Sequence, residues 1–399
     1  MTTLGFEAAL ELLRELRVVA VDEMEEVALG ASRGRVLAAS VAADRDQPPF
    51  DRATRDGFAV RAEDFNVGEL AVVGSVRAGQ RWTGAALGMG EAIEIMTGAP
   101  LPEGADAVAM VEHVVRKGEQ VRAAVGRSLV AGENVVEQGA EARAGQVLLP
   151  VGNVMGAAEI ALAAACGRAR VKVWRRPTVA IVATGDELVE LGTASALEPQ
   201  QIWNSNSYAI AAMVEAAGGE AVRLPITPDV REAVAASLER ARECDLVVLS
   251  GGVSMGEYDL VEEMLLAAGA EFFFTGVRMQ PGKPMVCGRL GEKLFFGLPG
   301  NPISTQVTFH CFVEPLLRRM CGEAGAAPRW GLARLAKEAE GKPGLTRLLP
   351  GRLDGVEAWV VGWQGSGDLA ANARANCYVE LPEGRATLAA GEYVRVLLR

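Results

Sequence analysis

The sequence predicts a multidomain α/β plus β protein, with a doubly wound domain, an inserted mostly-β domain, an elongated helical region and a small C-terminal β domain. A chain of 399 residues is long for one hydrophobic core, so several domains are expected. Strand and helix patterns alternate between residues 177 and 322, whereas short strands and turns fill much of the rest. The predicted domains are 1–46 with 144–176, 47–143, 177–324 and 325–399.

The N-terminal part is predicted to be helical. Apolar residues recur on one face between Phe6 and Leu16, and a second helix is expected near residues 27–42. Residues 151–176 return to an alanine-rich helix and a short strand, which would pack with the first helices. Between them, glycine and proline separate short β-branched runs. The mostly-β domain is therefore expected to be inserted into this helical region.

The doubly wound pattern runs from residue 177 to 322. Its apolar runs predict strands at 179–183, 221–225, 246–249, 272–277, 285–289 and 293–297. Helices are predicted after the polar run at 204–206, from Asp229 to about residue 243, from Leu260 and from Pro302. Taken alone, Asp229 is expected to cap its helix. In the last segment, strands are predicted at 358–362 and 393–398.

Composition argues against several classes of function. The formal net charge of −11 disfavours nucleic acid as a main partner, because a phosphate backbone requires a basic face. The chain lacks a run of roughly 18 apolar residues and a signal peptide, so we expect it to be neither membrane-spanning nor secreted. Six scattered cysteines and two histidines disfavour a zinc site and a disulfide framework. Buried, reduced thiols in a cytoplasmic protein are expected.

Five loops follow predicted strands and carry the chemistry of the chain. They are TGDE (184–187), TPD (227–229), SGGVSMGEYD (250–259), QPGKP (280–284) and GLPGNP (297–302). Ligands of a doubly wound sheet bind beyond the carboxyl ends of its strands, so we expect these loops to share one site. Each loop also has a purely structural interpretation as a turn, a helix cap or a proline-braced bend.

The loops combine groups that attract an anion with groups that repel one. Adjacent glycines let backbone N–H groups turn toward a phosphate, and QPGKP fixes Lys283 as a positive charge. The repelling groups are Asp186, Glu187, Asp229 and Asp259. A divalent cation reconciles the two, since Mg²⁺ takes one or two carboxylates and leaves its other positions to water and phosphate oxygens. The sequence therefore predicts a magnesium site at these four carboxylates.

Two common nucleotide-binding motifs are missing. The sequence contains no G-x-x-x-x-G-K-[ST], which excludes a P-loop nucleotidase. It also lacks G-x-G-x-x-G, which argues against a dinucleotide-dependent dehydrogenase. Catalysis that depends on histidine is disfavoured, because the two histidines, His113 and His310, lie far apart in the sequence.

The ordered set of motifs resembles the molybdopterin molybdenumtransferase family, and the E domain of gephyrin is similar. The resemblance runs from about residue 4 to the C-terminus and rests on PPFDRATRDGFAV (48–60), IMTGAPLPEGADAV (95–108), ATGDEL (183–188), SGGVSMGEYD, QPGKP and GLPGNPIS (297–304). It implies a homodimer of elongated four-domain subunits with a molybdopterin-binding doubly wound domain. It also implies magnesium-dependent insertion of molybdate into adenylylated molybdopterin with release of AMP. Contact with the molybdopterin adenylyltransferase is a further implied partnership.

Family roles fall on matching positions of this chain. The catalytic residues implied by the resemblance are Asp186, Glu187, Asp229, Asp259, Lys283, Asp56 and Thr97. Those implied to bind the pterin and phosphates are Thr184, Gly185, Asn206, Ser250, Gly251, Gly252, Ser254, Gly282, Pro299, Gly300 and Asn301. In the family the cleft lies between the doubly wound domain of one subunit and the β module of the other. A monomer should therefore be inactive.

Two segments depart from the family pattern. Before Asp56 the family usually has Asn-Ser-Ala-Met, whereas this chain has Arg52, Ala53, Thr54 and Arg55. In VVEQGAEA (135–142), Glu137 stands near the position of a family arginine and Glu141 replaces an aspartate. Charges are thus partly exchanged between the two segments, and either Arg52 or Arg55 could replace the missing arginines. The glutamine of QPGKP, where the family often has lysine, is a mild change.

Three functions stay open from sequence alone. The first is the molybdenumtransferase reaction. The second is a ligand-binding or scaffolding relative that holds the pterin but turns over poorly, as the altered segments would permit. The third is an insertase with a preference for tungstate or for another nucleotide-linked pterin. Release of AMP that depends on molybdate would distinguish the first from the others.

Overall fold

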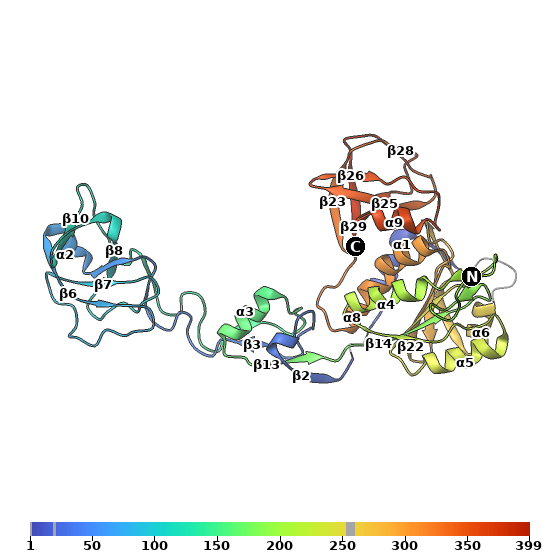
Figure 1. Ribbon diagram of the computed structural model, residues 1–399, viewed down its shortest axis with the longest axis horizontal. Helices are drawn as coiled ribbons and strands as arrows, with labels where there is room; N and C mark the ends of the chain where they lie inside the picture. The colour runs from blue at the N-terminus through green and yellow to red at the C-terminus, as the bar shows by residue number, and fades with distance from the viewer. Residues whose placement is uncertain (1, 19–20, 253–259) are drawn as a thin grey trace. The chain divides into compact units, whose positions relative to one another are not determined.

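A computed structural model of the chain describes residues 2–18, 21–252 and 260–399 (Figure 1). The chain divides into two compact units. Unit 1 comprises Met1–Ala38, Val151–Gly156 and Val171–Arg399, and unit 2 comprises Ala39–Pro150 and Ala157–Arg170. Each unit has its own hydrophobic cores. The predicted site residues Ser254 and Asp259 lie outside the described residues.

A six-stranded sheet forms the centre of unit 1. Its strands, in spatial order, are β17 (Glu220–Arg223), β14 (Thr178–Ala183), β18 (Leu246–Ser250), β22 (Lys293–Leu298), β21 (Val286–Leu290) and β19 (Ala270–Phe274). The first four are parallel, and the last two run antiparallel to their neighbours. Both faces are buried: Val179 and Ile181 enter one core, whereas Ala180 and Val182 enter the other. Burial on both faces explains why these strands are continuous apolar runs.

Helices cover both faces of this sheet, as the doubly wound pattern predicts (Figure 1). One face packs against α4 (Asn206–Ala216), α7 (Pro302–Thr308), a π-helical turn (Phe309–Val313) and α8 (Glu314–Met320). The other packs against α5 (Arg231–Ala241) and α6 (Leu260–Ala267). A short pair, β15 (Leu188–Val189) and β16 (Ile202–Trp203), lies between β14 and α4 in the chain.

The C-terminal segment forms most of a seven-stranded sheet. In spatial order this sheet contains β1 (Thr3–Gly5), β20 (Gly276–Gln280), β25 (Thr346–Asp354), β26 (Glu357–Val360), β23 (Trp330–Leu335), β29 (Tyr393–Leu398) and β27 (Cys377–Leu381). A short helix, α9 (Leu369–Arg374), and the pair β24 (Ala339–Glu340) and β28 (Thr387–Leu388) complete it. Two strands from outside the segment, β1 and β20, therefore extend its sheet.

The single strand expected at 272–277 is wrong. The chain instead forms β19 and β20, which belong to different sheets. Thr275 separates them, and its N–H donates to the carbonyl of Thr2 at 3.0 Å. An apolar run alone does not show where a chain leaves one sheet for another, because both sheets bury the same kinds of side chain.

The N-terminal expectations are partly correct. The first helix is α1 (Phe6–Glu15), with Phe6 and Leu13 buried. The second helix, expected near 27–42, is wrong: the chain forms β2 (Met24–Ala28), a 3₁₀ turn (Leu29–Ala31) and β3 (Val41–Ala42). Gly34 has φ +73°, which interrupts a helix. β2 pairs with β13 (Arg170–Trp174).

The helix after TPD also begins later than expected. Its first residue is Arg231 and its cap is Val230, so the prediction that Asp229 caps it is wrong. Instead, the N–H of Asp229 donates to Asp186 Oδ1 at 3.1 Å. Tertiary pairing with the neighbouring loop replaces the local cap, and the Asp229 carboxylate remains exposed.

Unit 2 is mostly β, as predicted for its central part. Its six-stranded sheet contains, in spatial order, β8 (Ala107–Met110), β5 (Gly57–Val60), β7 (Glu91–Ile95), β6 (Glu69–Val76), β10 (Gln120–Ala123) and β9 (Val114–Lys117). Phe58 and Val60 face one core, whereas Ala59 faces the other. The remaining elements are α2 (Ala62–Val67), α3 (Ala157–Ala165) and the pairs β4 (Arg52–Ala53) with β11 (Val135–Val136) and β3 with β12 (Val147–Leu149).

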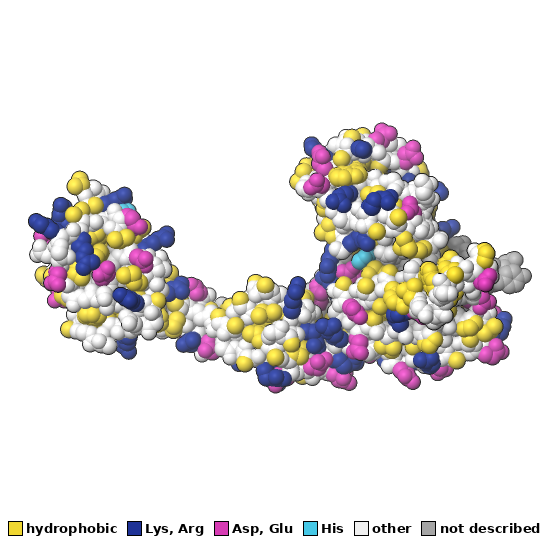
Figure 2. Space-filling model, in the orientation of Figure 1, with side chains coloured by type: hydrophobic (Ala, Val, Ile, Leu, Met, Phe, Trp, Pro, Cys, Tyr) yellow, Lys and Arg dark blue, Asp and Glu magenta, His cyan; other side chains and the backbone are white. Residues whose placement is uncertain are grey.

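The surface carries both signs of charge. Figure 2 shows acidic and basic side chains interspersed on the visible face. Among the described residues, no helix combines the length and apolar character needed to cross a membrane. The six cysteines are free and buried, in agreement with the expected reduced thiols.

Candidate functional site

Four of the five predicted loops meet at the carboxyl edge of the six-stranded sheet. The N–H of Thr184, after β14, donates to the carbonyl of Ser250 at the end of β18 at 3.1 Å. Gly185 N–H lies 3.4 Å from the carbonyl of Thr227. Gly251 N–H lies 3.3 Å from the carbonyl of Leu298, at the end of β22. The expectation that TGDE, TPD, SGG and GLPGNP share one edge is therefore confirmed in the described residues.

The glycines of the SGG loop are required by its backbone. Gly251 has φ +90° and Gly252 has φ +62°, values that side-chain-bearing residues rarely adopt. A Cβ on Gly251 would lie 2.6 Å from the carbonyl oxygen of Thr184, so a larger residue would displace the TGDE loop. Thr184 itself is buried, and its hydroxyl has no hydrogen-bond partner among the described residues. An unpartnered donor beside two glycines suits a loop that approaches a ligand closely.

Asn206 connects two of the loops. It is the first residue of α4, and its side-chain N–H₂ donates to Ser250 Oγ at 3.0 Å and to the carbonyl of Gly300 at 2.8 Å. Both donors are thus used within the protein. Asn206 is therefore placed to hold the SGG and PGNP loops together. Neighbouring Asn204 accepts from the N–H of Ser207, in the first turn of α4, at 3.3 Å.

The acidic loops bring their carboxylates close together. Asp186, Glu187 and Asp229 are exposed, and the N–H of Asp229 bonds Asp186 as described above. Partial burial and the negative charges of Asp186 and Glu187 raise the pKa of Asp229. This crowding of negative charge favours a cation at the same place. Asp259, the fourth predicted ligand, falls outside the described part of the chain.

Within residues 2–18, 21–252 and 260–399, no group of three or more acidic, histidine or cysteine side chains is arranged to hold a metal ion. Asp186 and Asp229 nevertheless fit the Mg²⁺ type of site, which takes one or two carboxylates and completes its shell with water and phosphate oxygens. The contact between the Asp229 N–H and Asp186 Oδ1 supports this fit, because it brings the two acidic residues together; burial first, and then their repulsion, raise the pKa of Asp229.

The PGNP loop is exposed at its tip. Gly300 and Asn301 reach solvent, whereas Pro299 is buried and its carbonyl accepts a hydrogen bond from Thr305 Oγ1 at 2.6 Å. Pro302 begins α7, as expected. One N–H of the first turn is not free for a ligand, because Ile303 N–H donates to the carbonyl of Ser366 at 2.9 Å.

The QPGKP loop corrects the prediction that it follows a strand of the doubly wound sheet. It follows β20, a strand of the seven-stranded sheet. A Cβ on Gly282 would lie 2.5 Å from Thr308 Cγ2, so this loop packs directly against α7. Lys283 is exposed, and among the described residues its side chain makes no hydrogen bond or ion pair. The QPGKP loop thus reaches α7 from the seven-stranded sheet, and the ammonium group of Lys283 stays unpaired within the described residues.

Unit 2 contains the remaining predicted pair. Asp56 Oδ1 accepts hydrogen bonds from the N–H of Thr97 at 2.6 Å and from Thr97 Oγ1 at 2.8 Å. These two bonds lower the pKa of Asp56, because they favour its charged form. Asp56, Phe58, Glu94 and Arg116 line a cavity of about 290 Å³. Asp56 is therefore a fixed carboxylate that faces a small cavity.

The two unusual segments of unit 2 pair with each other. β4 and β11 are antiparallel neighbours, and Arg52 bonds Glu141 at 3.1 Å. The exchanged charges therefore compensate each other locally. Arg55 is exposed, and among the described residues its side chain makes no hydrogen bond or ion pair. Of Arg52 and Arg55, it is therefore Arg55 that remains unpaired in the described part of the chain.

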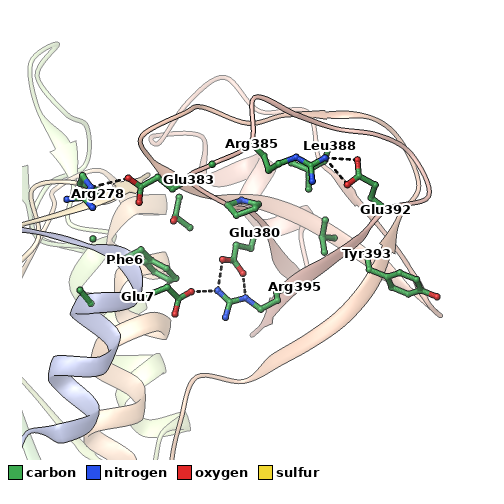
Figure 3. Close-up of a pocket in the computed structure, with 16 residues that line it drawn as sticks. Phe6, Glu7, Arg278, Glu380, Glu383, Arg385, Leu388, Glu392, Tyr393 and Arg395 are labelled. Atoms are coloured by element: carbon green, nitrogen blue, oxygen red, sulfur yellow. Dashed lines mark hydrogen bonds and ion pairs between the residues drawn. The ribbon is translucent and has the colours of Figure 1, made fainter.

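Some supporting residues have no signal in the sequence. Glu190, between the TGDE loop and α4, accepts from Tyr208 Oη and from Arg223, both at 2.6 Å. Asn372 bonds Gln306 in α7. A larger cavity of about 640 Å³ in unit 1, lined by α1 and the C-terminal sheet, contains none of the predicted residues (Figure 3). Spacing could not reveal these contacts, because each joins segments that only the fold brings together.

Three family models match the chain in order. They are the MoeA N-terminal region (domain I and II) over residues 4–167, a probable molybdopterin binding domain over 180–319, and the MoeA C-terminal region (domain IV) over 332–398. Together they span almost all of the chain. The multidomain architecture predicted from the sequence is thus that of a known family.

Relatives and solved structures agree with these matches. A molybdopterin molybdenumtransferase of Nostoc sp. (strain PCC 7120) is 37% identical over 395 residues, covering 94% of this chain and 88% of the relative. One from Staphylococcus aureus (strain COL) is 34% identical and covers 93% and 90%. The molybdopterin biosynthesis moeA protein of Pyrococcus horikoshii OT3 has a TM-score of 0.86 at 30% identity, covering both chains completely. The chain belongs to the molybdopterin molybdenumtransferase family.

Proposed function

We propose that this protein completes molybdenum cofactor biosynthesis by inserting molybdate into adenylylated molybdopterin and releasing AMP. The observation that carries the proposal is the meeting of the glycine-turned SGG loop with the TGDE, TPD and PGNP loops at one sheet edge. Amide groups and carboxylates side by side suit a phosphoanhydride accompanied by a cation. The curated relatives carry the name of this activity.

The sheet edge would hold the substrate. The Gly252 amide would bind a phosphate, since the Gly251 N–H already donates to the Leu298 carbonyl, and Thr184 and Ser250 supply hydroxyls beside it. When bound, Mg²⁺ at Asp186 and Asp229 would neutralise phosphoryl oxygens and orient water. Lys283 would attract molybdate by its charge. Gly185, Gly282, Pro299, Gly300 and Asn301 shape the loops so that these groups reach the ligand. For Glu187 and Asp259 we propose a part in the metal site, and for Ser254 a contact with the pterin and phosphates, as the family resemblance implies.

Asp56 would act from the six-stranded sheet of unit 2. Its low pKa keeps it ionised, and Thr97 fixes its orientation. We propose a homodimer in which this carboxylate serves the sheet edge of the other subunit. A surface along α1 that combines Ala8, Leu12, Leu16 and Phe273 with Glu11 and Glu15 could accommodate a second copy. The free, buried thiols support a cytoplasmic location, where the adenylyltransferase would supply the substrate directly.

The test is a release assay with purified protein, adenylylated molybdopterin and Mg²⁺. AMP release that requires molybdate supports the proposal. Binding of the substrate without AMP release would contradict it and indicate a scaffold. Faster release with tungstate would contradict the proposed metal specificity. Asp56→Asn provides a matched inactive control, because its side chain is exposed and changes only in charge.

A further inference from the structure

The C-terminal segment contacts two of the five site loops directly. The QPGKP loop continues β20, which pairs in parallel with β25 through Met279 opposite Thr346 and Gln280 opposite Arg347. The PGNP loop leads into α7, whose Ile303 N–H donates to the carbonyl of Ser366. PGNP and the other three loops follow strands of the six-stranded sheet. QPGKP and PGNP are thus the two loops that also contact the C-terminal segment.

A buried amide pair strengthens the contact with α7. Asn372 Nδ2 donates to Gln306 Oε1 at 2.8 Å, and both residues are buried. A hydrogen bond in such surroundings is costly to break, because the acceptor left behind has no access to water. Among the described residues, Asn372 Oδ1 is a buried atom without a hydrogen-bond partner. The side chain also lies beside Tyr378, but its N–H₂ donates to the helix that carries PGNP.

The short helix that presents Asn372 is held at both ends. Asp368 accepts from the N–H groups of Ala371 at 2.9 Å and Gln364 at 3.1 Å, which lowers the pKa of Asp368. At the other end Arg399 donates to the carbonyl of Asn372 at 2.7 Å. The helix therefore forms a fixed support despite its length of 6 residues.

The segment is also fixed on its opposite side. Figure 3 shows Arg395 of β29 directed at Glu380 and at Glu7 of α1, while Arg278 of β20 bonds Glu383 at 3.2 Å. These ion pairs join the C-terminal strands to α1 and β20, both outside the segment. A support held at two places can transmit its position to a loop, whereas a mobile appendage cannot.

We infer that the C-terminal segment positions the QPGKP and PGNP loops for the ligand, and that Asn372 is the positioning residue acting through Gln306. Substrate binding by these loops rests on the proposed function, whereas the mechanical coupling does not. Loss of Asn372 should loosen α7 around Gln306 and weaken substrate binding, while the chemical groups at the sheet edge remain in place.

The test compares Asn372→Ala with Asn376→Ala in the full-length protein. Asn376 lies in the same segment and makes two hydrogen bonds with Leu353, neither of which reaches α7. Amide hydrogen exchange of the ligand-free protein is measured across residues 299–308. Asn372→Ala should speed exchange there on the order of tenfold, whereas Asn376→Ala should leave it unchanged. Equal exchange in the two variants would overturn the inference.

Kinetics provide a second readout that general destabilisation would not mimic. Asn372→Ala should raise KM for adenylylated molybdopterin on the order of tenfold with kcat nearly unchanged, and Asn376→Ala should change neither. Gln306→Ala should give the same increase, and the double variant should show no further increase, because both changes remove one interaction. Additive increases would overturn the coupling. If wild-type protein releases no AMP, the proposed function fails, and hydrogen exchange still decides the coupling.

Discussion

The sheet edge of unit 1 and the region around Asp56 in unit 2 are built in different ways. At the sheet edge, position is determined by backbone: Gly251 and Gly252 adopt positive φ, and loop amides bond loop carbonyls. In unit 2, position is determined by side chains, with Thr97 holding Asp56 and Arg52 pairing with Glu141. A site whose shape depends on backbone conformation tolerates few substitutions. A surface held by side-chain contacts can exchange charged residues between neighbouring segments and keep its net charge.

The energies fit this distinction. Arg52 and Glu141 are 39% and 55% exposed, so their ion pair contributes roughly 0–1 kcal/mol. A side chain at Gly251 would instead force a close contact with the Thr184 carbonyl. Changes in unit 2 should therefore alter chemistry with little effect on folding. Changes in the glycine loops should alter binding through shape.

Asp56→Asn should have the largest effect on turnover. It removes a charge that two hydrogen bonds from Thr97 stabilise, and loss of an acid–base or electrostatic group lowers rates by about 10²–10⁴-fold. The melting temperature should hardly change, because the side chain is exposed. Rates of AMP release and thermal unfolding check both statements. Full activity in Asp56→Asn would remove unit 2 from the chemistry.

Gly252→Val should weaken substrate binding on the order of 10–100-fold. Its φ of +62° strains a β-branched residue by about 1–3 kcal/mol, and its Cβ would lie 2.4 Å from Val261 Cγ2 and 2.8 Å from Thr184 Oγ1. Gly269→Val is the matched control, since Gly269 has φ +81° but open space around it. Titration calorimetry should show weak binding in the first variant alone. Equal affinities would mean that the SGG loop does not contact the substrate.

Thr97→Val should shift the pH dependence of turnover. The rate itself should change by no more than about tenfold. The pKa of Asp56 lies below its ordinary value, so this carboxyl stays ionised as the pH falls. Removing the Thr97 hydroxyl leaves only the N–H bond, and the pKa of Asp56 should rise. The acid limb of the rate profile should shift to higher pH. An unmoved limb would show that another group controls it.

Asp186→Asn should reduce the stabilisation of the protein by Mg²⁺. The pKa of Asp229 is raised, so its contribution to stability is present below the ordinary value near 3.8 and is lost as the pH rises through the folded pKa. At neutral pH the two carboxylates repel, and a cation relieves this. Mg²⁺ should raise the wild-type melting temperature by about 2–4 °C and that of Asp186→Asn by less. Equal shifts would place the ion elsewhere.

Arg55→Met should have the smallest effect, a several-fold loss of molybdate affinity. Arg55 has a free guanidinium, whereas Arg52 is neutralised by Glu141. Arg52→Met is the control and should change affinity less. Molybdate dependence of AMP release provides the measurement. Unchanged affinity in Arg55→Met would end the idea that this residue replaces the missing family arginines.

Periodicity and spacing predicted the parts of the fold that local sequence controls. The apolar runs of β14, β18 and β22 and the glycine loops after them were predictable, because buried parallel strands need apolar side chains and tight turns need glycine. The division of residues 270–280 between two sheets was not, since pairing partners decide it. The Asn372–Gln306 contact was not predictable either, because 66 residues separate the partners.

A crystal structure with AMP, molybdate and Mg²⁺ tests the central claim most directly, that amides and carboxylates at the sheet edge converge on one cation-bridged phosphate. We expect the phosphate within hydrogen-bond distance of the Gly252 amide, with the ion between it and Asp186 or Asp229. A phosphate bound elsewhere, for example in the cavity beside Glu380 and Arg395, would contradict the claim.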